Sequence, residues 1–237
     1  MASVKTILFD VDGTLVDSNE AHVRAWIAAL REGGYDVPAA RVRPLLGMGG
    51  DKLLPALGVG LTADDEPGTT IAARRKALFL EREAPRLRPT HGARELVEFV
   101  RAEGLRRVVA SSASDDELDA LLRAAGVEDL FDATTSSDDA ASSKPDPDIV
   151  RAALARSETD ASQAVMIGDT RFDVDAAARV GVPCITLRCG GRPDDELAEA
   201  IATFDDPADL EAALAERGVD ALIEARGAGV VAARRTR

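Results

Sequence analysis

A short apolar stretch near the start of the chain runs directly into two acidic residues. Residues 4 to 9 are mostly apolar, and Asp10, Asp12 and Gly13 follow at once. A run of this length predicts a buried strand, and open α/β sheets bind ligands beyond the carboxyl ends of their strands. Carboxylates so close together repel each other unless a cation holds them, which indicates metal-assisted chemistry. The alternative is a strand that ends in a solvated Asp-Gly turn.

The second half of the chain alternates short apolar runs with amphipathic segments. The apolar runs predict strands at residues 107–111, 131–135, 164–168 and 183–187. The amphipathic segments predict helices at residues 92–103, 114–126 and 172–180. Ser114 and Glu117 have the spacing of a capping box at the start of the second of these helices. Such alternation implies a parallel sheet with right-handed crossovers, so the fold class is α/β with a parallel-sheet core.

The segment between the first strand and residue 89 has helical patterns and no convincing strand. His22 and Trp26 share one face of a helix expected from residue 18 to about residue 34, and a clear helix is expected over residues 71–83. This block predicts an all-helical insertion. We therefore expect a core at residues 1–17 and 89–225, a helical domain at residues 18–88, and a basic, disordered tail at residues 226–237.

The composition restricts where the protein acts and what it binds. Hydrophobic residues make up 46% of the 237 residues, so a sizeable core can form, and the formal net charge is -13 at pH 7. Nucleic acid and anionic membranes need clustered Lys and Arg, so we expect neither as a partner. Without a membrane-length apolar run or a signal peptide, a cytoplasmic protein is expected. Cys184 and Cys189 have no metal-type spacing and form no disulfide framework.

Three further junctions of the predicted α/β pattern carry polar residues suited to phosphate chemistry. They contribute, in chain order, the hydroxyls of Ser111 and Ser112, the amine of Lys144, and the carboxylates of Asp169 and Asp173. If the strands are neighbours, these groups meet the first acidic pair at one edge of the sheet. Carboxylates, a hydroxyl, a lysine and helix N-termini together predict a phosphate site with a metal.

Each of these chemical groups has a physical role in phosphoryl transfer. A carboxylate that attacks phosphorus forms an acyl phosphate and divides the transfer into two easier steps. Mg²⁺ between carboxylates and phosphate oxygens offsets the repulsion between two anions, and a lysine offsets the remaining charge. Hydroxyl and backbone N–H groups bind the other phosphoryl oxygens. A second carboxylate can protonate the leaving oxygen and later deprotonate water.

The four elements in this order resemble the four motifs of the haloacid dehalogenase-like (HAD) hydrolases, and the resemblance covers about residues 4–187. Most members of that family are magnesium-dependent phosphotransferases with an aspartate nucleophile. The resemblance implies a Rossmann-like core with an inserted helical cap, Mg²⁺ as cofactor, and a small phosphorylated metabolite as substrate. It implies that Asp10 is the nucleophile and Asp12 the general acid/base, with the Asp12 backbone carbonyl also binding the metal.

The resemblance also assigns roles to the remaining groups. Ser111 and Lys144 would hold the phosphoryl group, with Ser112 as a competitor for the position of Ser111. Asp169 would bind Mg²⁺ directly, and Asp173 would support the metal. Two of these residues have structural alternatives: Lys144 as a solvated loop lysine, and Asp173 as an acid that satisfies the dipole of a first helical turn.

The helical block resembles the family's small cap, which closes over the core and supplies substrate contacts. Gly47, Met48 and Gly49 lie in a loop that resembles the cap's specificity loop, for which a flexible helix connection is the alternative. His22 is a further candidate for substrate contact, with a packed or hinge histidine as the alternative. Residues 74–76 are Arg-Arg-Lys on a cap helix, where we expect a solvated charged face and place anion binding second.

Several functions are compatible with this resemblance. A phosphatase for small phosphomonoesters, for example of the phosphoglycolate phosphatase-like subgroup, is the main expectation, as a monomer or homodimer. β-Phosphoglucomutases resemble residues 17–26, but they typically carry a cap-loop arginine where this chain has glycines, and often Glu-Asp where it has Gly168-Asp169. Haloalkanoate dehalogenases lack the second acid, Asp12. A ligand-binding regulatory protein without turnover is disfavoured because no catalytic position is missing.

Overall fold

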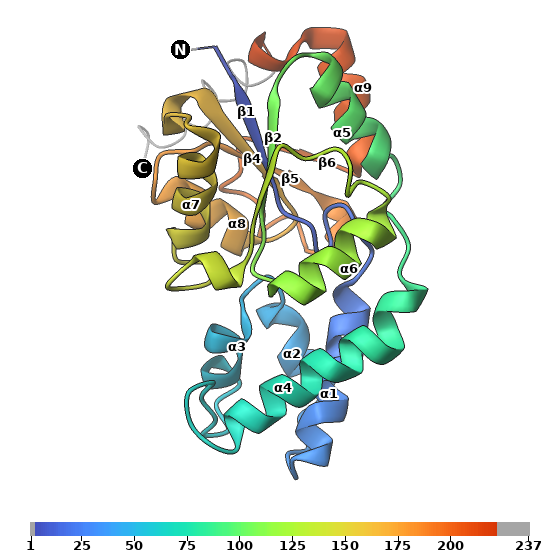
Figure 1. Cartoon of the computed structure of the whole chain (residues 1–237), viewed down its shortest axis with the longest axis vertical. Helices are drawn as coiled ribbons and strands as arrows, with labels where there is room; N and C mark the ends of the chain where they lie inside the picture. Colours follow the sequence, from blue (N-terminus) through green and yellow to red (C-terminus); the bar gives the residue numbers. More distant parts are fainter. Residues whose placement is uncertain (1–2, 222–237) are drawn as a thin grey trace.

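The sheet at the centre of the molecule has six parallel strands in the order β3-β2-β1-β4-β5-β6 (Figure 1). The structure is a computed structural model that describes residues 3–221. The strands are β1 (Thr6–Phe9), β2 (Arg106–Ala110), β3 (Ala133–Thr135), β4 (Ala164–Gly168), β5 (Cys184–Leu187) and β6 (Ala202–Phe204). Because β1 pairs with β2 and β4, its carboxyl end lies between those of two neighbours. The predicted α/β fold class is confirmed; the predicted tail at residues 226–237 lies outside the described residues.

Alternate residues of the central strands enter two cores on opposite faces of the sheet. Leu8 packs in one cluster with residues of α7 (Asp148–Ser157) and α8 (Arg171–Ala178). Ile7 and Phe9 belong to the other cluster, with residues of α5 (Ala93–Ala102), α6 (Asp115–Ala125) and α9 (Pro207–Arg217). Since helices cover both faces, β1 and β4 are buried along their whole length, and this explains their continuous apolar sequences.

Residues 18–88, all of which the structure describes, form helices and turns and no strand of the sheet, as predicted. The helices are α1 (Asn19–Glu32), α2 (Ala39–Val42), α3 (Gly50–Ala56) and α4 (Gly68–Leu78), which continues into a π-helical turn at Phe79–Glu83. Figure 1 shows these helices grouped beyond the carboxyl end of the sheet, with α1 beside α4. Short 3₁₀ turns lie at Arg43–Leu45, Ala84–Arg86, Ser137–Asp139, Ala161–Gln163 and Arg188–Gly190. The division into core and cap domains at residues 18 and 88 stays a prediction.

Two features of the fold differ from the sequence-based expectation. The strand β6 and the helix α9 were not predicted, because β6 has only three residues and follows a loop without a hydrophobic pattern. The capping box expected at Ser114 and Glu117 is wrong. Ser114 does precede α6, but its hydroxyl donates to the Glu117 carboxylate at 2.9 Å and makes no side-chain cap. Glu117 is held instead by an ion pair with Arg75 of α4, which no local pattern could reveal.

Candidate active site

The segments that follow the strands place four acidic or basic side chains at one edge of the sheet. Asp10 follows β1 directly, Asp169 follows β4, and Asp173 lies in the first turn of α8. Lys144 comes from the loop before α7. The predicted gathering of these groups is therefore found in the structure, and it follows from the parallel order β2-β1-β4.

Lys144 lies between two carboxylates in the interior of the site. Its Nζ donates to Asp10 Oδ1 and to Asp173 Oδ1, both at 2.6 Å, and the residue has no exposed surface. Burial alone lowers the pKa of a lysine, but the charges of Asp10 and Asp173 outweigh it and raise the pKa of Lys144. The alternative of a solvated loop lysine is thus wrong, and the side chain is a fixed positive charge beside Asp10.

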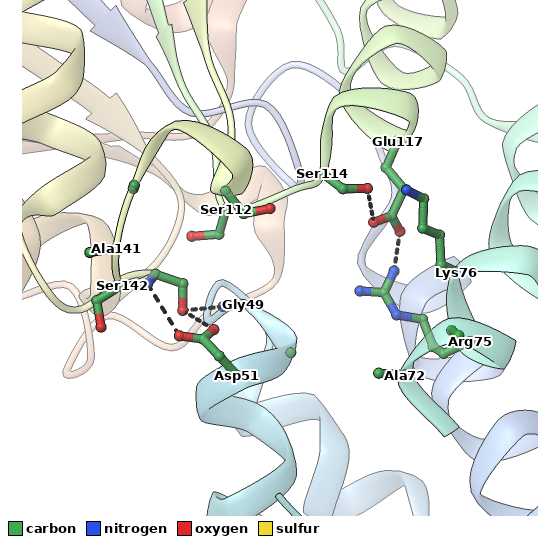
Figure 2. A pocket seen from close by; sticks show the side chains of 15 residues that line it. Gly49, Asp51, Ala72, Arg75, Lys76, Ser112, Ser114, Glu117, Ala141 and Ser142 are labelled. Atoms are coloured by element: carbon green, nitrogen blue, oxygen red, sulfur yellow. Dashed lines mark hydrogen bonds and ion pairs between the residues drawn. The ribbon is translucent and has the colours of Figure 1, made fainter. Parts of the chain in front are cut away.

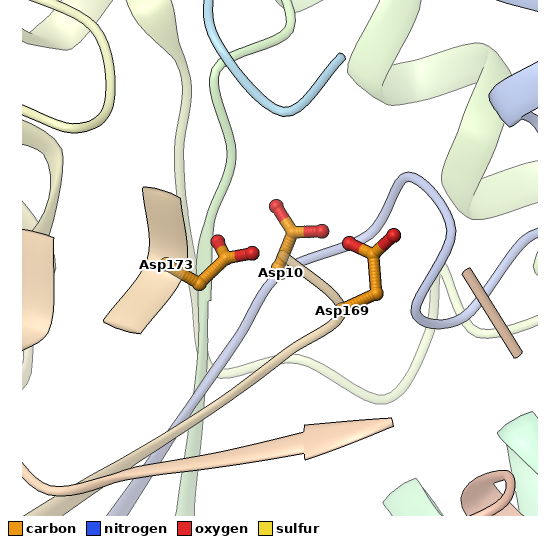
Figure 3. Close-up of side chains that lie close together, drawn as sticks. All are labelled: Asp10, Asp169 and Asp173. Carbon is orange, nitrogen blue, oxygen red and sulfur yellow. The ribbon is translucent and has the colours of Figure 1, made fainter. Parts of the chain in front are cut away.

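Asp10, Asp169 and Asp173 form a cluster of buried carboxylates (Figure 3). One oxygen from each lies within 4.8 Å of the others. Asn19 donates to Asp169 Oδ2 at 3.0 Å, whereas Asp169 Oδ1 is buried and has no hydrogen-bond partner among the described residues. Hard oxygen donors with an unsatisfied lone pair are what Mg²⁺ prefers, so the cluster fits the expected cofactor.

Electrostatics within this cluster also favour a cation. Burial raises the pKa of Asp10 from 3.8 to about 7, and the charge of Asp173 adds to the rise while Lys144 opposes it. Burial, together with the charges of Asp10 and Asp173, raises the pKa of Asp169 well above its ordinary value. A bound divalent cation would reverse both shifts, because it stabilises the ionised carboxylates.

Asp173 holds the first turn of its helix and lies in the acidic cluster. Its Oδ2 accepts hydrogen bonds from the backbone N–H of Thr170 at 3.0 Å and from the Thr170 hydroxyl at 2.7 Å, which closes a capping box at the start of α8. Its Oδ1 accepts from Lys144. The interpretation of Asp173 as an acid of the first helical turn is therefore confirmed, and the start of α8 fixes its carboxylate within the acidic cluster.

Two glycines make room for Asp169. Gly13 has φ +74°, and a Cβ there would overlap the Asp169 carboxylate and Asn19. A Cβ at Gly190 would also overlap the Asp169 carboxylate. Glycine at these positions therefore lets two loops approach the acid closely. Gly190 was not identified from the sequence because it lies after β5, outside the four motifs.

Asp12 faces away from the cluster, toward the helices of residues 18–88. Its Oδ1 accepts from the Ser18 hydroxyl at 2.5 Å and contacts His22 Nε2 at 2.7 Å. Burial favours a higher pKa for Asp12, but the charge of His22 and hydrogen bonds from His22 and Ser18 outweigh it, so the pKa is lowered. The His22 ring also stacks on Phe79 with centroids 4.0 Å apart. His22 is thus a packed histidine, and it is also the partner of the second acid.

The two candidate serines occupy different positions. Ser111 is buried, and its Oγ accepts a hydrogen bond from the backbone N–H of Ala113 at 3.1 Å. Ser112 lies beside Lys144, whose backbone N–H donates to its Oγ at 3.4 Å, and it lines a cavity with Asp10 and Asp12. In this arrangement Ser112 faces the cavity and Ser111 supports the loop that follows β2.

That cavity, of about 50 Å³, lies between the two acids and the loop that contains Gly47. Gly47, Met48 and Gly49 all line it. The glycines serve a second purpose, because a Cβ at Gly47 would crowd Thr170 and a Cβ at Gly49 would crowd Ser143. The Gly49 backbone N–H also donates to Ser143 Oγ at 3.1 Å, next to Lys144 in the chain. The loop is therefore docked on the core rather than a loose connection.

Arg75 departs from the expected solvated face of residues 74–76. Its side chain is only 14% exposed, lies over the Trp26 ring at 4.9 Å, pairs with Glu117 and lines the cavity. Arg74 pairs with Glu32 on the outside, as expected of an exposed residue. The sequence could not distinguish them, because the partner of Arg75 is 42 residues away. Trp26 and Glu117 are further cavity residues that sequence reasoning did not identify as such.

The sequence matches the family model of the haloacid dehalogenase-like hydrolases over residues 4–181. The chain belongs to this family. It is 34% identical to a phosphoglycolate phosphatase of Rhodospirillum rubrum, over 87% of this chain and 89% of that one. It is 31% identical to a probable phosphatase, IndB, of Dickeya dadantii, over 82% of this chain and 85% of the relative.

The fold agrees with this family assignment. The structure of a hydrolase from Pseudomonas syringae superposes with a TM-score of 0.83 at 28% identity and covers 90% of this chain and 98% of its own. The family and its named relatives confirm the expectation of a HAD-like phosphatase enzyme.

Proposed function

We propose that the protein hydrolyses a small phosphomonoester in two steps, through a covalent phosphoryl-enzyme on Asp10. The observation that carries this proposal is the position of the Asp10 carboxylate. It lies at the carboxyl end of β1, held by Lys144 at 2.6 Å and by the Thr14 hydroxyl at 3.1 Å, in the same cavity as Asp12. Such fixed hydrogen bonds orient a carboxylate for attack on a bound phosphoryl group.

In the first step, a carboxylate oxygen of Asp10 bonds to phosphorus, and the bond from phosphorus to the leaving oxygen breaks. Asp12 gives its proton to that oxygen, which departs as an alcohol. In the second step, a water oxygen bonds to phosphorus while the bond between Asp10 and phosphorus breaks, and Asp12 takes the proton of the water. Since the pKa of Asp12 is lowered, the pair with His22 favours the ionised form that the second step needs. The first step uses the protonated form, which the proton taken from water in each second step regenerates.

The other charged side chains neutralise the phosphoryl group. Lys144 supplies a buried positive charge, and Ser112 supplies a hydroxyl at the cavity wall. Asp10, Asp169 and Asp173 would hold Mg²⁺, with the backbone carbonyl of Asp12 as a further ligand. Mg²⁺ in this place would offset the repulsion between the phosphoryl oxygens and the carboxylates.

The test is the hydrolysis of p-nitrophenyl phosphate by purified protein with Mg²⁺ and with a chelator. We expect turnover only with the metal, and we expect Asp10→Asn to lower kcat by about 10³-fold or more, since the nucleophile is lost. Asp10→Asn should keep the far-UV circular dichroism of the parent. A folded parent protein without metal-dependent turnover would contradict the proposal, as would an active Asp10→Asn variant.

A sugar phosphate mutase uses the same first step but returns the phosphoryl group to a second hydroxyl. The mutase alternative is disfavoured because the cap loop offers Gly47, Met48 and Gly49 where a mutase typically places an arginine for the distal phosphate. Incubation with β-glucose 1-phosphate separates the two functions. A phosphatase releases inorganic phosphate, whereas a mutase produces glucose 6-phosphate.

We further propose that the partner is a small phosphorylated metabolite and that neither nucleic acid nor a membrane is bound, with the protein acting in the cytoplasm as a monomer or homodimer. The net charge of -13 supports the exclusion of nucleic acid and anionic membranes, because the protein would repel these polyanions. Within residues 3–221, no helix is both long and apolar enough to cross a membrane.

A further inference from the structure

A second cavity, of about 390 Å³, adjoins the one that contains Asp10 and Asp12 (Figure 2). The two share Gly49, Arg75, Ser112 and Glu117 in their walls. A phosphoryl group placed at Asp10 would therefore direct the rest of its ester toward these shared residues. The chemistry of the shared wall then decides which alcohols the site accepts.

The charges in this wall are already paired. Arg75 forms an ion pair with Glu117, whose side chain is 4% exposed, and Lys76 pairs with Asp116 at 2.9 Å. These are the only arginine and lysine among the described residues that line either cavity. A second anionic group that reaches the shared wall would lie beside the Glu117 carboxylate as well as beside Arg75, whose charge Glu117 already offsets. Like charges in a wall with little water repel strongly.

The uncharged part of the wall suits hydroxyl groups. Apart from Asp51, Arg75, Lys76 and Glu117, the larger cavity is lined by glycines, alanines and five serines, which are Ser112, Ser114, Ser137, Ser142 and Ser143. Serine hydroxyls both donate and accept hydrogen bonds, so this part of the wall can bind the neutral hydroxyl groups of a ligand.

We propose that Glu117 is a specificity-determining residue: it selects phosphomonoesters of neutral, hydroxyl-bearing alcohols and rejects esters that carry a second anionic group. The inference rests on the proposed phosphatase function. Its physical basis is rejection by an unfavourable charge contact rather than a gain of contacts to the preferred substrate. The substrate preference proposed for this chain therefore differs from phosphoglycolate, the substrate that the name of its relative from Rhodospirillum rubrum gives.

Two phosphate esters of similar size separate the effect of a second negative charge on the substrate from the effect of substrate size. 2-Hydroxyethyl phosphate and 2-phosphoglycolate differ in a hydroxymethyl group against a carboxylate, and the measured quantity is the ratio of their kcat/KM values at saturating Mg²⁺. We expect the parent enzyme to favour 2-hydroxyethyl phosphate by about tenfold or more. Glu117→Gln keeps the shape and the hydrogen-bond acceptor, and we expect it to reduce this ratio by about tenfold.

Two further variants control the measurement. Asp119→Asn removes the same charge two positions later on α6, where the residue is exposed and lines neither cavity, and should leave the ratio within about twofold of the parent. Arg75→Gln leaves Glu117 without its counter-charge and should raise the ratio, the opposite direction to Glu117→Gln. Melting temperatures show whether each variant is folded.

The outcomes separate this inference from the proposed function. A parent ratio below one, an unchanged ratio in folded Glu117→Gln, or a ratio that rises in that variant overturns the role of Glu117. A rise would mean that Glu117 orients Arg75 toward an anion. If the parent enzyme hydrolyses neither ester nor p-nitrophenyl phosphate, the proposed function itself fails, and this inference fails with it.

Discussion

At the scale of single residues, the site is defined by carboxylates that are buried close together. Asp10 and Asp169 are both easier to protonate than ordinary aspartates, because burial and neighbouring acids disfavour their ionised forms. Lys144 offsets part of this repulsion, and it is fully buried between Asp10 and Asp173. The remaining repulsion explains why the chain would gain stability from a divalent cation.

This charge arrangement predicts how metal stabilisation depends on pH. The folded-state pKa of Asp10 is raised to about 7 from 3.8, so its contribution to stability is fully present below pH 3.8 and is lost as the pH rises through 7. The metal-free protein should therefore be less stable at pH 8 than at pH 5. Mg²⁺ binds the ionised carboxylates and should raise the melting temperature more at pH 8 than at pH 5.

Differential scanning calorimetry with Mg²⁺ and with a chelator measures both effects. For a chain of this length, a stabilisation of 1 kcal/mol corresponds to a shift of about 3 °C. Asp169→Asn should remove most of the Mg²⁺-dependent shift, while Asp119→Asn, on the exterior of α6, should keep it. An equal or larger Mg²⁺ effect at pH 5 would contradict the assignment of these carboxylates as metal ligands.

The location of a site residue could be predicted from the sequence where the residue belongs to a motif. The burial and pairing of a residue could be predicted less well where its partner lies far along the chain. The gathering of Asp10, Lys144, Asp169 and Asp173 follows from strand ends that any parallel sheet brings together. The state of Arg75 does not, because its burial depends on a core helix that lies far along the chain. A local pattern shows which face of a helix is charged but not what covers that face.

At the scale of elements, helix α3 ties the helices of residues 18–88 to the loop that carries Lys144. Lys52 Nζ contacts Asp146 Oδ2 at 2.5 Å, and Asp146 also accepts from Arg179 at 2.7 Å. The Asp51 carboxylate accepts a hydrogen bond from the Ser143 hydroxyl. These contacts flank Lys144, so the position of α3 and the position of the buried lysine depend on the same loop.

Lys52→Met should weaken this docking without touching the reacting groups. We expect KM for p-nitrophenyl phosphate to rise by about threefold with a smaller change in kcat, because the pair is one-third exposed and contributes modestly. Steady-state kinetics at low and high salt measure the effect, since salt should reduce the difference between parent and variant. Arg24→Met, which breaks an exposed pair between helical segments of residues 18–88, is the control and should keep the parent KM. A raised KM in both variants would show that the effect is not specific to the docking of α3.

Strands with an apolar pattern of their own were predictable, including the three-residue β3, whereas the edge strand β6 was not. The strands β1, β2, β4 and β5 are buried apolar runs, and their positions agree with the sequence-based prediction. The edge strand β6 has three residues, and pairing with β5 rather than its own composition makes it a strand. The absence of a capping box at Ser114 has the same cause, since Glu117 is engaged by another element.

At the scale of the whole molecule, the groups proposed to react with the phosphoryl group and the groups proposed to select the substrate come from different parts of the chain. The sheet edge supplies Asp10, which is the proposed nucleophile, together with Lys144 and the acidic cluster. The helices of residues 18–88 supply His22, Trp26 and Arg75 to the cavity. Asp12 connects the two, because it follows β1 and pairs with His22 of α1. The family membership accounts for the first part, and the second part is where this chain can differ from its relatives.

The central claim is that Asp10 becomes covalently phosphorylated, and trapping the phosphoryl-enzyme tests it most directly. In Asp12→Asn, p-nitrophenyl phosphate still reacts because its leaving group needs no proton, but water is no longer deprotonated, so the intermediate should accumulate. Borohydride reduces an aspartyl phosphate to homoserine, which peptide mass spectrometry locates. We predict homoserine at position 10 only with substrate and Mg²⁺ present. Stoichiometric release of p-nitrophenol with position 10 unmodified, or with the label on another residue, would contradict the account.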